Sequence, residues 1–269
     1  MASVNQMGEG NLPSVTDLFS LKGKTAICTG GTGGLGLSMA IALAEAGANI
    51  VSIQIKDDPR ASMLAEAVKE CGRELKVFEA DVADSPSLRA CFAKIWDAGV
   101  VPDILLNCAG INRRAKVEDF TDENIDAVFS INLKASFVAA QEFGKKLLEL
   151  KRPGKIINIA SIISFIGNIN IAAYACTKGG VLQMTKAMSN EWASKGINVN
   201  CICPGYIKTA MTKVYTDDAE YTKYIIDRTP AGRWGLPEDF RGVVIFLASK
   251  ASDFVCGTSI VVDGGILAK

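Results

Sequence analysis

The sequence predicts a single doubly wound α/β domain with a seven-stranded parallel sheet. Seven short apolar runs alternate with segments of helical periodicity along the chain. Most of these runs are apolar at consecutive positions, which is typical of strands that are buried on both faces of a parallel sheet. A sheet of this kind needs a layer of helices on each side. Strand and helix alternation together with doubly buried strands therefore predicts the fold class.

The first half of the chain supplies four of the predicted strands. The helices between them have clear ends, because Gly47 and Gly72 are natural helix terminators and Ser85 is expected to be an N-cap before Pro86. The predicted strands are 24–29, 48–53, 76–82 and 103–110, and the predicted helices are 35–47, 57–72 and 85–99.

The second half continues the same alternation. The predicted strands are 154–161, 197–205 and 257–265, and the predicted helices are 121–150, 172–196 and 237–249. Residues 209–227 interrupt the pattern and are expected to form a lid. Neither a proline- or serine-rich linker nor an internal repeat divides the chain, so residues 21–269 are predicted to be one domain and residues 1–20 an N-terminal lead-in.

Composition narrows the possible functions. The chain has 269 residues, a formal net charge of zero and no histidine. Without a basic field it is not expected to bind nucleic acid or a membrane surface, and no apolar run approaches the roughly 18 residues of a membrane span. Eight cysteines lie scattered without a CxxC pair. This usage predicts no metal site and a reducing, cytoplasmic location.

A glycine cluster, TGGTGGLG at residues 29–36, follows the first predicted strand and opens the first helix. Glycine lets the backbone turn sharply and approach a pyrophosphate, which then lies at the positive end of the helix. The alternative is a tight turn with no ligand. Two registers fit the dinucleotide pattern, Gly31-x-Gly33-x-x-Gly36 and Gly30 with Gly34 and Gly36. The position of the cluster predicts a Rossmann-type domain that binds NAD(H) or NADP(H).

The end of the second strand bears on the choice of cofactor. An acidic residue there would hold the adenosine ribose of NAD, but the chain has Gln54, which neither requires NAD nor repels the phosphate of NADP. The glycine cluster contains no basic residue, which favours NAD(H), whereas Lys56 keeps NADP(H) possible. The sequence leans toward NAD(H).

Several separate motifs occur along the chain in an order that is typical of one protein family. They are TGGTGGLG, Asp81-Val82, NCAG at 107–110, Asn132, Ser161, Tyr174-x-x-x-Lys178 and PGYIKT at 204–209. From about residue 21 to residue 269 the chain thereby resembles the short-chain dehydrogenase/reductase family. The resemblance implies catalysis by Asn132, Ser161, Tyr174 and Lys178.

Tyr174 and Lys178 are four residues apart, so they project from one helix face. A free tyrosine titrates near pH 10, and moving its pKa to 7 needs about 4 kcal/mol of preference for the phenolate. A lysine ammonium and an oxidised nicotinamide both carry charge of the right sign. Ser161 is expected to hydrogen-bond the substrate oxygen. By resemblance, Lys178 also holds the nicotinamide ribose, and Asn132 keeps a water in a proton path to Lys178.

The resemblance extends to the cofactor. It implies that Asp81 and Val82 contact adenine, Asn107 and Gly110 form the cofactor floor, and Ile207 and Thr209 meet the nicotinamide amide. The full predicted set is Gly30, Thr32, Gly34, Leu35, Gly36, Gln54, Asp81, Val82, Asn107, Ala109, Gly110, Tyr174, Lys178, Pro204, Gly205, Ile207 and Thr209.

Four cysteines lie near these motifs. Cys108 departs from the family's usual NNAG and is expected to pack, as is Cys176, which should point away from the catalytic pair. Cys201 and Cys203 share one face of a strand and are interpreted as core.

Within the family, the chain resembles 2-deoxy-D-gluconate 3-dehydrogenases, also described as 2-keto-3-deoxygluconate oxidoreductases. The shared stretches include KIINIASIISFIG and DRTPAGRWGLPEDF. AGINRRAKVEDF shares their paired arginines, and either Arg113 or Arg114, with Arg113 preferred, is expected to hold a substrate carboxylate. The alternative is that both arginines are solvated surface residues.

The expected function is therefore interconversion of a secondary alcohol and a ketone. A sugar acid such as 2-deoxy-D-gluconate is the expected substrate, and Arg113, Ser161 and Tyr174 are expected to bind it. Alternatives are a reductase of 3-oxoacyl thioesters, a ketoreductase of a specialised-metabolite pathway, and a non-enzymatic NAD(P)-binding regulator. The family resemblance also implies a homotetramer.

Overall fold

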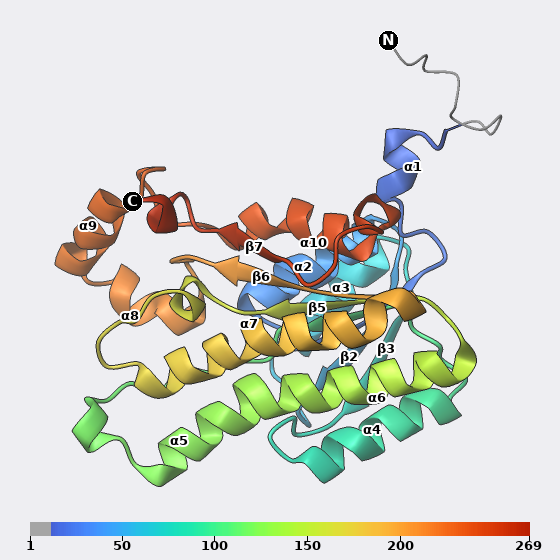
Figure 1. Ribbon diagram of the computed structural model, residues 1–269, viewed down its shortest axis with the longest axis horizontal. Helices are drawn as coiled ribbons and strands as arrows, with labels where there is room; N and C mark the ends of the chain where they lie inside the picture. The colour runs from blue at the N-terminus through green and yellow to red at the C-terminus, as the bar shows by residue number, and fades with distance from the viewer. Residues whose placement is uncertain (1–11) are drawn as a thin grey trace.

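Seven parallel strands lie at the centre of the computed structural model, which describes residues 12–269 (Figure 1). Their order across the sheet is β3-β2-β1-β4-β5-β6-β7, so the predicted seven-stranded parallel sheet is confirmed. The strands are β1 (Thr25–Thr29), β2 (Asn49–Gln54), β3 (Leu75–Glu79), β4 (Ile104–Asn107), β5 (Gly154–Ile159), β6 (Ile197–Pro204) and β7 (Ser259–Val262). The chain builds outward from β1 to β3 and then returns to place β4 beside β1. Ligands of such sheets bind at the carboxyl ends of the strands where the winding reverses.

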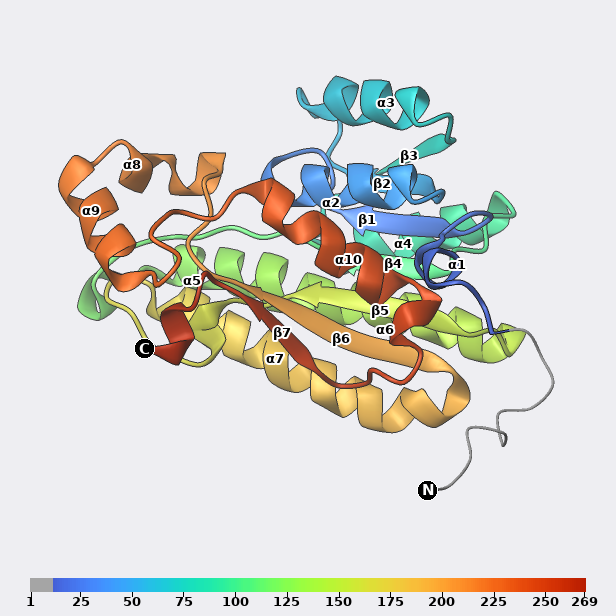
Figure 2. The ribbon, with the colours of Figure 1, turned by 90° about the horizontal axis from the view of Figure 1, so that it is seen from above.

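Helices cover both faces of the sheet (Figures 1 and 2). Helices α2, α3 and α10 lie on one face, and α4, α6 and α7 on the other. The helices are α1 (Val15–Phe19), α2 (Gly34–Glu45), α3 (Ala61–Glu70), α4 (Ser85–Asp97), α5 (Asp122–Phe129), α6 (Ala135–Leu150), α7 (Ala172–Trp192), α8 (Lys213–Thr216), α9 (Ala219–Arg228) and α10 (Arg241–Ala248).

Two apolar layers hold these helices on the sheet. On one face Phe92 of α4 and Phe143 of α6 are fully buried, and on the other Leu43 of α2 packs in the same cluster as Val244 of α10. Full burial of one such side chain contributes about 1.5–3 kcal/mol. Because both faces are covered, the central strands carry apolar side chains at consecutive positions, as the sequence showed.

Three local expectations differ from the structure. The N-cap of α4 is Asp84, whose carboxylate accepts a hydrogen bond from the Ser87 amide, and Ser85 is already helical. Either side chain can cap, and the backbone selects the one with extended geometry. The helix predicted at 121–150 contains a π-helical turn at Ser130–Lys134 between α5 and α6. Cys176 is exposed rather than packed, because it lies roughly 200° around α7 from Tyr174.

The lead-in is described only from residue 12, and the rest of the segment 1–20 lies outside the described residues. Within it, α1 begins after Ser14 and brings Phe19 against Phe246 of α10, with 6.4 Å between the ring centroids. Among residues 12–269, no helix has the length and apolar character required to cross a membrane.

Candidate active site

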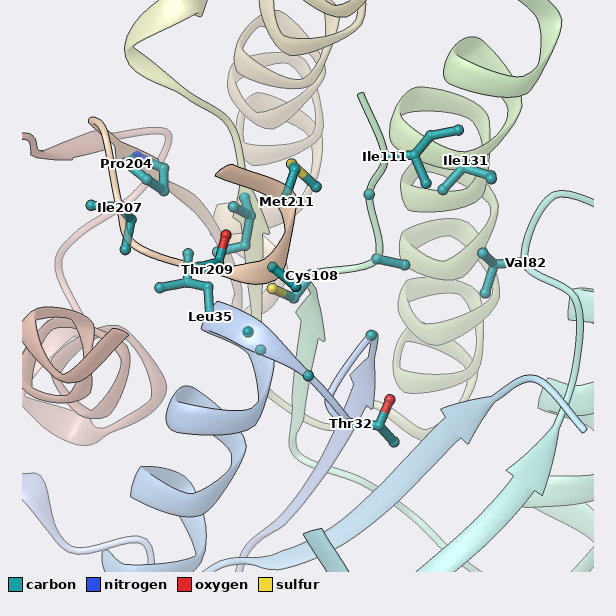
Figure 3. Close-up of a pocket in the computed structure, with 18 of the residues that line it drawn as sticks. Thr32, Leu35, Val82, Cys108, Ile111, Ile131, Pro204, Ile207, Thr209 and Met211 are labelled. Atoms are coloured by element: carbon teal, nitrogen blue, oxygen red, sulfur yellow. The ribbon is translucent and has the colours of Figure 1, made fainter. Parts of the chain in front are cut away.

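A cleft of about 400 Å³ opens at the carboxyl ends of the strands, between the glycine turn and the segments that follow β4, β5 and β6 (Figure 3). Most of the predicted cofactor and catalytic residues line it. They are Gly30, Thr32, Gly34, Leu35, Gly36, Gln54, Val82, Ala109, Gly110, Ser161, Tyr174, Lys178, Pro204, Gly205, Ile207 and Thr209. Asp81, Asn107, Asn132 and Arg113 do not line it. The cleft thus gathers residues from widely separated motifs.

The glycine turn is shaped to let another molecule approach its backbone. Gly30 and Gly34 have positive φ angles of 67° and 53°, which side chains disfavour. A Cβ on Gly30 would lie 2.7 Å from the Ala109 backbone, and one on Gly36 would overlap the Gly30 carbonyl oxygen. The backbone therefore favours the register Gly30, Gly34 and Gly36. With α2 starting at Gly34, this cradle fits the pyrophosphate of a dinucleotide.

The segment after β6 closes the cleft opposite the glycine turn. Thr209 lies beside that turn, 3.6 Å from the position of a Cβ on Gly34, and Ile207 is buried (Figure 3). Met211 continues along the cleft from the same segment. The predicted lid is helical, comprising α8 and α9, and its first residues contribute to the cleft wall.

Ser161, Tyr174 and Lys178 meet at one end of the cleft. Ser161 follows β5, and its hydroxyl accepts a hydrogen bond from the Ile163 amide at 3.1 Å. Tyr174 and Lys178 lie on the 21-residue helix α7, with the Lys178 Nζ 5.5 Å from the centre of the Tyr174 ring. Lys178 Nζ also donates a 2.6 Å hydrogen bond to the Ile159 carbonyl. Two elements packed on the core therefore hold a hydroxyl, a phenol and an ammonium together.

Burial changes the proton affinity of this group. It raises the pKa of Tyr174 to about 12, and a hydrogen bond with Ser161 opposes the rise. It lowers the pKa of Lys178 to about 8. Positive charge was expected to lower the pKa of Tyr174, but in the protein without cofactor desolvation raises this pKa instead. At pH 7 Tyr174 is a neutral phenol and Lys178 is mostly a cation.

Asn132 lies in the π-helical turn, just behind the cleft. Its Oδ1 accepts a 2.8 Å hydrogen bond from the Ile111 amide, and its Nδ2 donates to the Ile111 carbonyl at 2.9 Å and to Thr177 at 3.2 Å. Its side chain thus ties the loop after β4 to α7. π-Helical turns often occur at functional sites because they redirect one side chain. The water contact expected of Asn132 remains a prediction.

Two residues expected at the cofactor lie outside the cleft wall. The Asp81 carboxylate accepts a hydrogen bond from the Ala83 amide, while the adjacent Val82 lines the cleft. Asn107 is buried below the floor and donates hydrogen bonds to the Ser136 carbonyl and to Asn158. Asn107 therefore supports the floor from beneath, since its side chain does not face the cleft.

The cysteines divide between cleft and core. Cys108 lines the cleft and also packs against the apolar layer that contains α2. Burial raises the pKa of its thiol to about 12, so it remains a neutral side chain. Cys201 and Cys203 are fully buried in β6, which confirms their interpretation as core.

The paired arginines lie on the loop after β4. Both arginines are exposed, and the Arg114 guanidinium lies over the ring of Tyr215 in α8, 4.4 Å from its centre. Among the described residues neither arginine forms an ion pair. The loop after β4 therefore contacts α8, which lies in the segment predicted to form a lid, through Arg114.

Two residues of the cleft, Asp58 and Arg60, were not predicted from the sequence. Both lie in the short loop after β2. In this loop Lys56 was the cation expected to make NADP(H) possible. Asp58 is buried, and Arg60 lies beside Gly33 of the glycine turn. The signal in the sequence that could have predicted them is Asp58-Pro59-Arg60, which lies shortly after the second predicted strand.

Comparison with known proteins extends these observations. A sequence profile of the family described as Enoyl-(Acyl carrier protein) reductase matches residues 30–267. The chain is 43% identical to a 2-dehydro-3-deoxy-D-gluconate 5-dehydrogenase of Dickeya dadantii, over 95% of this chain and 100% of that one. It is 38% identical to a 5-keto-D-gluconate 5-reductase of Escherichia coli, over 94% and 99% of the two chains.

A solved structure has the same arrangement. It is a gluconate 5-dehydrogenase from Burkholderia cenocepacia J2315 in complex with NADP and tartrate. The TM-score is 0.90 and the identity 39%, over 95% of this chain and 100% of that one.

Proposed function

The chain belongs to the short-chain dehydrogenase/reductase family, and we propose that it interconverts a secondary alcohol and a ketone in a sugar acid, using NAD(H) or NADP(H). The observation that carries this proposal is the meeting of Ser161, Tyr174 and Lys178 in a cleft that begins at the glycine turn. The relatives named above are dehydrogenases and reductases of sugar acids, which supports that substrate class.

Ser161, Tyr174 and Lys178 each have a separate role at the substrate oxygen. When bound, the nicotinamide supplies or accepts the hydride. Ser161 donates a hydrogen bond to the carbonyl oxygen and orients it. Tyr174, protonated at neutral pH, gives its proton to that oxygen during reduction and takes it back during oxidation. The Lys178 ammonium stabilises the phenolate that Tyr174 becomes after giving up its proton.

Apolar side chains surround this end of the cleft. Ile111, Ile131 and Met211 line it, and Figure 3 shows them on segments from three parts of the chain. This apolar wall would limit the water around the reacting atoms once substrate and cofactor are bound, and so would strengthen the hydrogen bonds of Ser161 and Tyr174. Asn132 holds Ile111 in place through two backbone hydrogen bonds.

We assign recognition of the substrate carboxylate to Arg113. Both arginines are exposed, but the Arg114 guanidinium contacts the Tyr215 ring, which makes Arg113 the better candidate for a carboxylate. A guanidinium binds a carboxylate through two parallel hydrogen bonds. Because the neighbouring Arg114 contacts Tyr215 in the predicted lid, substrate binding at Arg113 would be sensed by that segment.

A panel assay tests the proposed reaction. The purified protein is mixed with NADH or NADPH and with 2-keto-3-deoxygluconate, 5-ketogluconate, a 3-oxoacyl thioester or a cyclic ketone. We expect cofactor oxidation with a keto sugar acid. Turnover only with the thioester would favour the acyl reductase, turnover only with the cyclic ketone would favour the specialised ketoreductase, and binding without any turnover would favour a regulator.

The remaining expectations concern assembly, location and cofactor. The homotetramer stays a prediction, supported by the half-exposed Phe137 on α6 and checked by sedimentation velocity. The cytoplasmic location also stays a prediction, and the eight cysteines are free thiols as expected in a reducing compartment. The lean toward NAD(H) depended on the lack of a basic residue in the glycine turn, and Arg60 supplies one from the next loop.

A further inference from the structure

Lys178 is hydrogen-bonded to both ends of the segment that carries Ser161. At one end its Nζ donates a 2.6 Å hydrogen bond to the carbonyl of Ile159, the last residue of β5. At the other end the Ser164 hydroxyl donates a 2.7 Å hydrogen bond to the Lys178 carbonyl oxygen. Ser161 lies between these two contacts. The segment 159–164 is therefore attached to α7 on either side of the hydroxyl that the proposed reaction uses.

A short 3₁₀ turn, Ile162–Ser164, connects the second contact to Ser161. The Ser164 amide donates a 2.9 Å hydrogen bond to the Ser161 carbonyl, and the Ile163 amide donates a 3.1 Å hydrogen bond to the Ser161 hydroxyl. Because both hydrogen bonds close within one turn, Ser161 and Ser164 move together. A shift of Ser164 relative to α7 therefore shifts the Ser161 hydroxyl.

The two contacts with Lys178 respond differently to proton transfer. The hydrogen bond to Ile159 uses the Lys178 ammonium, which lies 5.5 Å from the centre of the Tyr174 ring and is assigned to the phenolate. The hydrogen bond from Ser164 uses a backbone carbonyl of a 21-residue helix, whose position does not depend on the charge of Tyr174. Ser164 thus supplies the contact that stays fixed while the proton moves.

The Ser164 hydroxyl is not needed to keep the turn on the core. The adjacent Ile162 and Ile163 are 2% and 8% exposed and belong to an apolar cluster with Ile171. A helix carbonyl also accepts its own helical amide, so removal of the hydroxyl leaves the Lys178 carbonyl paired. Ser164 is half-buried and does not line the cleft. The role left to its hydroxyl is to set the position of Ser161.

Resting on the proposed function, we propose that Ser164 is a positioning residue, whose hydroxyl holds the Ser161 hydroxyl where it reaches both Tyr174 and the substrate carbonyl oxygen. A hydrogen bond links Ser161 and Tyr174. Both must bind one substrate oxygen, so an error in their separation weakens their hydrogen bonds in the transition state. A misplacement of about 1 Å costs on the order of 100-fold in rate. A loosened turn should therefore lower kcat more than it raises KM.

Steady-state kinetics on the full chain test this proposal, with saturating cofactor and the substrate found in the panel assay. Ser164→Ala removes the hydroxyl, and Ser164→Thr retains it. Ser249→Ala is the matched control, because the Ser249 hydroxyl donates a 3.1 Å hydrogen bond to the Phe246 carbonyl of α10, outside the cleft. Fluorescence titration measures the dissociation constant of the cofactor. Thermal unfolding checks that each variant is folded at the assay temperature.

We expect Ser164→Ala to lower kcat by about 10- to 100-fold, with KM and the cofactor dissociation constant within about threefold of the wild type. Ser164→Thr should recover kcat to within about threefold, and Ser249→Ala should keep it. An unchanged kcat in Ser164→Ala, a change confined to KM, an equal loss in Ser249→Ala or no recovery with threonine would overturn the proposal. Turnover by the wild type would then leave the proposed function in place. Absence of wild-type turnover on every ketone of the panel would overturn both.

Discussion

The two ends of the cleft are built differently. At the catalytic end, Tyr174 and Lys178 project from a 21-residue helix and Lys178 is 5% exposed. At the end next to β2, Arg60 belongs to a short loop, its side chain is 56% exposed, and the buried carboxylate of Asp58 forms an ion pair with it. Proton transfer depends on geometry that regular elements packed on a core provide. Selection of a cofactor depends on one or two contacts that a loop can supply, so this end is easier to alter.

The largest effect is expected from Tyr174→Phe at the catalytic end. Loss of the phenolic hydroxyl removes the proton donor, so kcat should fall by at least about 10³-fold. The cofactor dissociation constant should change by less than about threefold, since the ring remains. Steady-state kinetics and fluorescence titration measure the two quantities. Tyr224→Phe, at a half-exposed lid tyrosine, is the matched control and should retain activity. Near-normal turnover by Tyr174→Phe would refute the assigned role.

Gly36→Ala tests the turn between the two ends. The added Cβ would overlap the Gly30 carbonyl oxygen, so the glycine turn must move away from its cradle shape. We expect cofactor affinity to fall by about 100-fold and kcat at saturating cofactor to fall less. Gly179→Ala on α7 is the control, because its Cβ would meet no atom within 4 Å. Equal cofactor affinity in the two variants would show that the turn does not contact the cofactor.

Asp58→Asn tests how much the ionised Asp58 carboxylate contributes to the free energy of unfolding. The pKa of Asp58 in the folded protein is about 2, below its unfolded value, so folding favours the ionised form. Its contribution of about 2 kcal/mol is present above about pH 4 and is lost as the pH falls toward 2. Urea unfolding at pH 7 should show that loss in the variant, and the difference from wild type should shrink in acid.

Asp57→Asn is the control for this measurement. Asp57 is exposed and has a φ of 54°, a conformation that asparagine tolerates well. It should leave the free energy of unfolding nearly unchanged. A similar loss in both variants would mean that burial of the Asp58 carboxylate is not the cause.

The smallest effect is expected on the loop after β4, with Arg113→Ala. Removing a carboxylate partner should raise KM for the sugar acid about tenfold and leave kcat within about twofold. Lys116→Ala, an exposed cation on the same loop, should change neither. An unchanged KM in Arg113→Ala would reassign the carboxylate to another group.

Much of the fold could be predicted because its signals are local. Each strand shows as an apolar run, and Gly47 with a φ of 111° ends its helix as expected. The π-helical turn around Asn132 was not predictable, because one inserted residue barely alters helical periodicity. The cap of α4 was misplaced by one residue because Asp84 and Ser85 can both accept the required hydrogen bond.

The candidate site was likewise predicted in part from local signals. Ser161, Tyr174 and Lys178 were predicted from spacing and motif order, and they line one cleft. Arg60 was not predicted, because nothing local distinguishes it from Lys56. Only the contact between Asp58 and Thr32, which are 26 residues apart, orients Arg60 toward the glycine turn.

The sequence by itself determined the sheet, the glycine turn and the pair on α7, because periodicity and an i, i+4 spacing need no distant partner. The tertiary structure decided the pKa values of Tyr174 and Lys178 and the position of the Arg60 guanidinium beside the glycine turn. Burial, which raises the pKa of Tyr174 to about 12, exists only after the layers have packed. The orientation of Arg60 likewise exists only where the loop after β2 meets the turn after β1, since Asp58 must reach both.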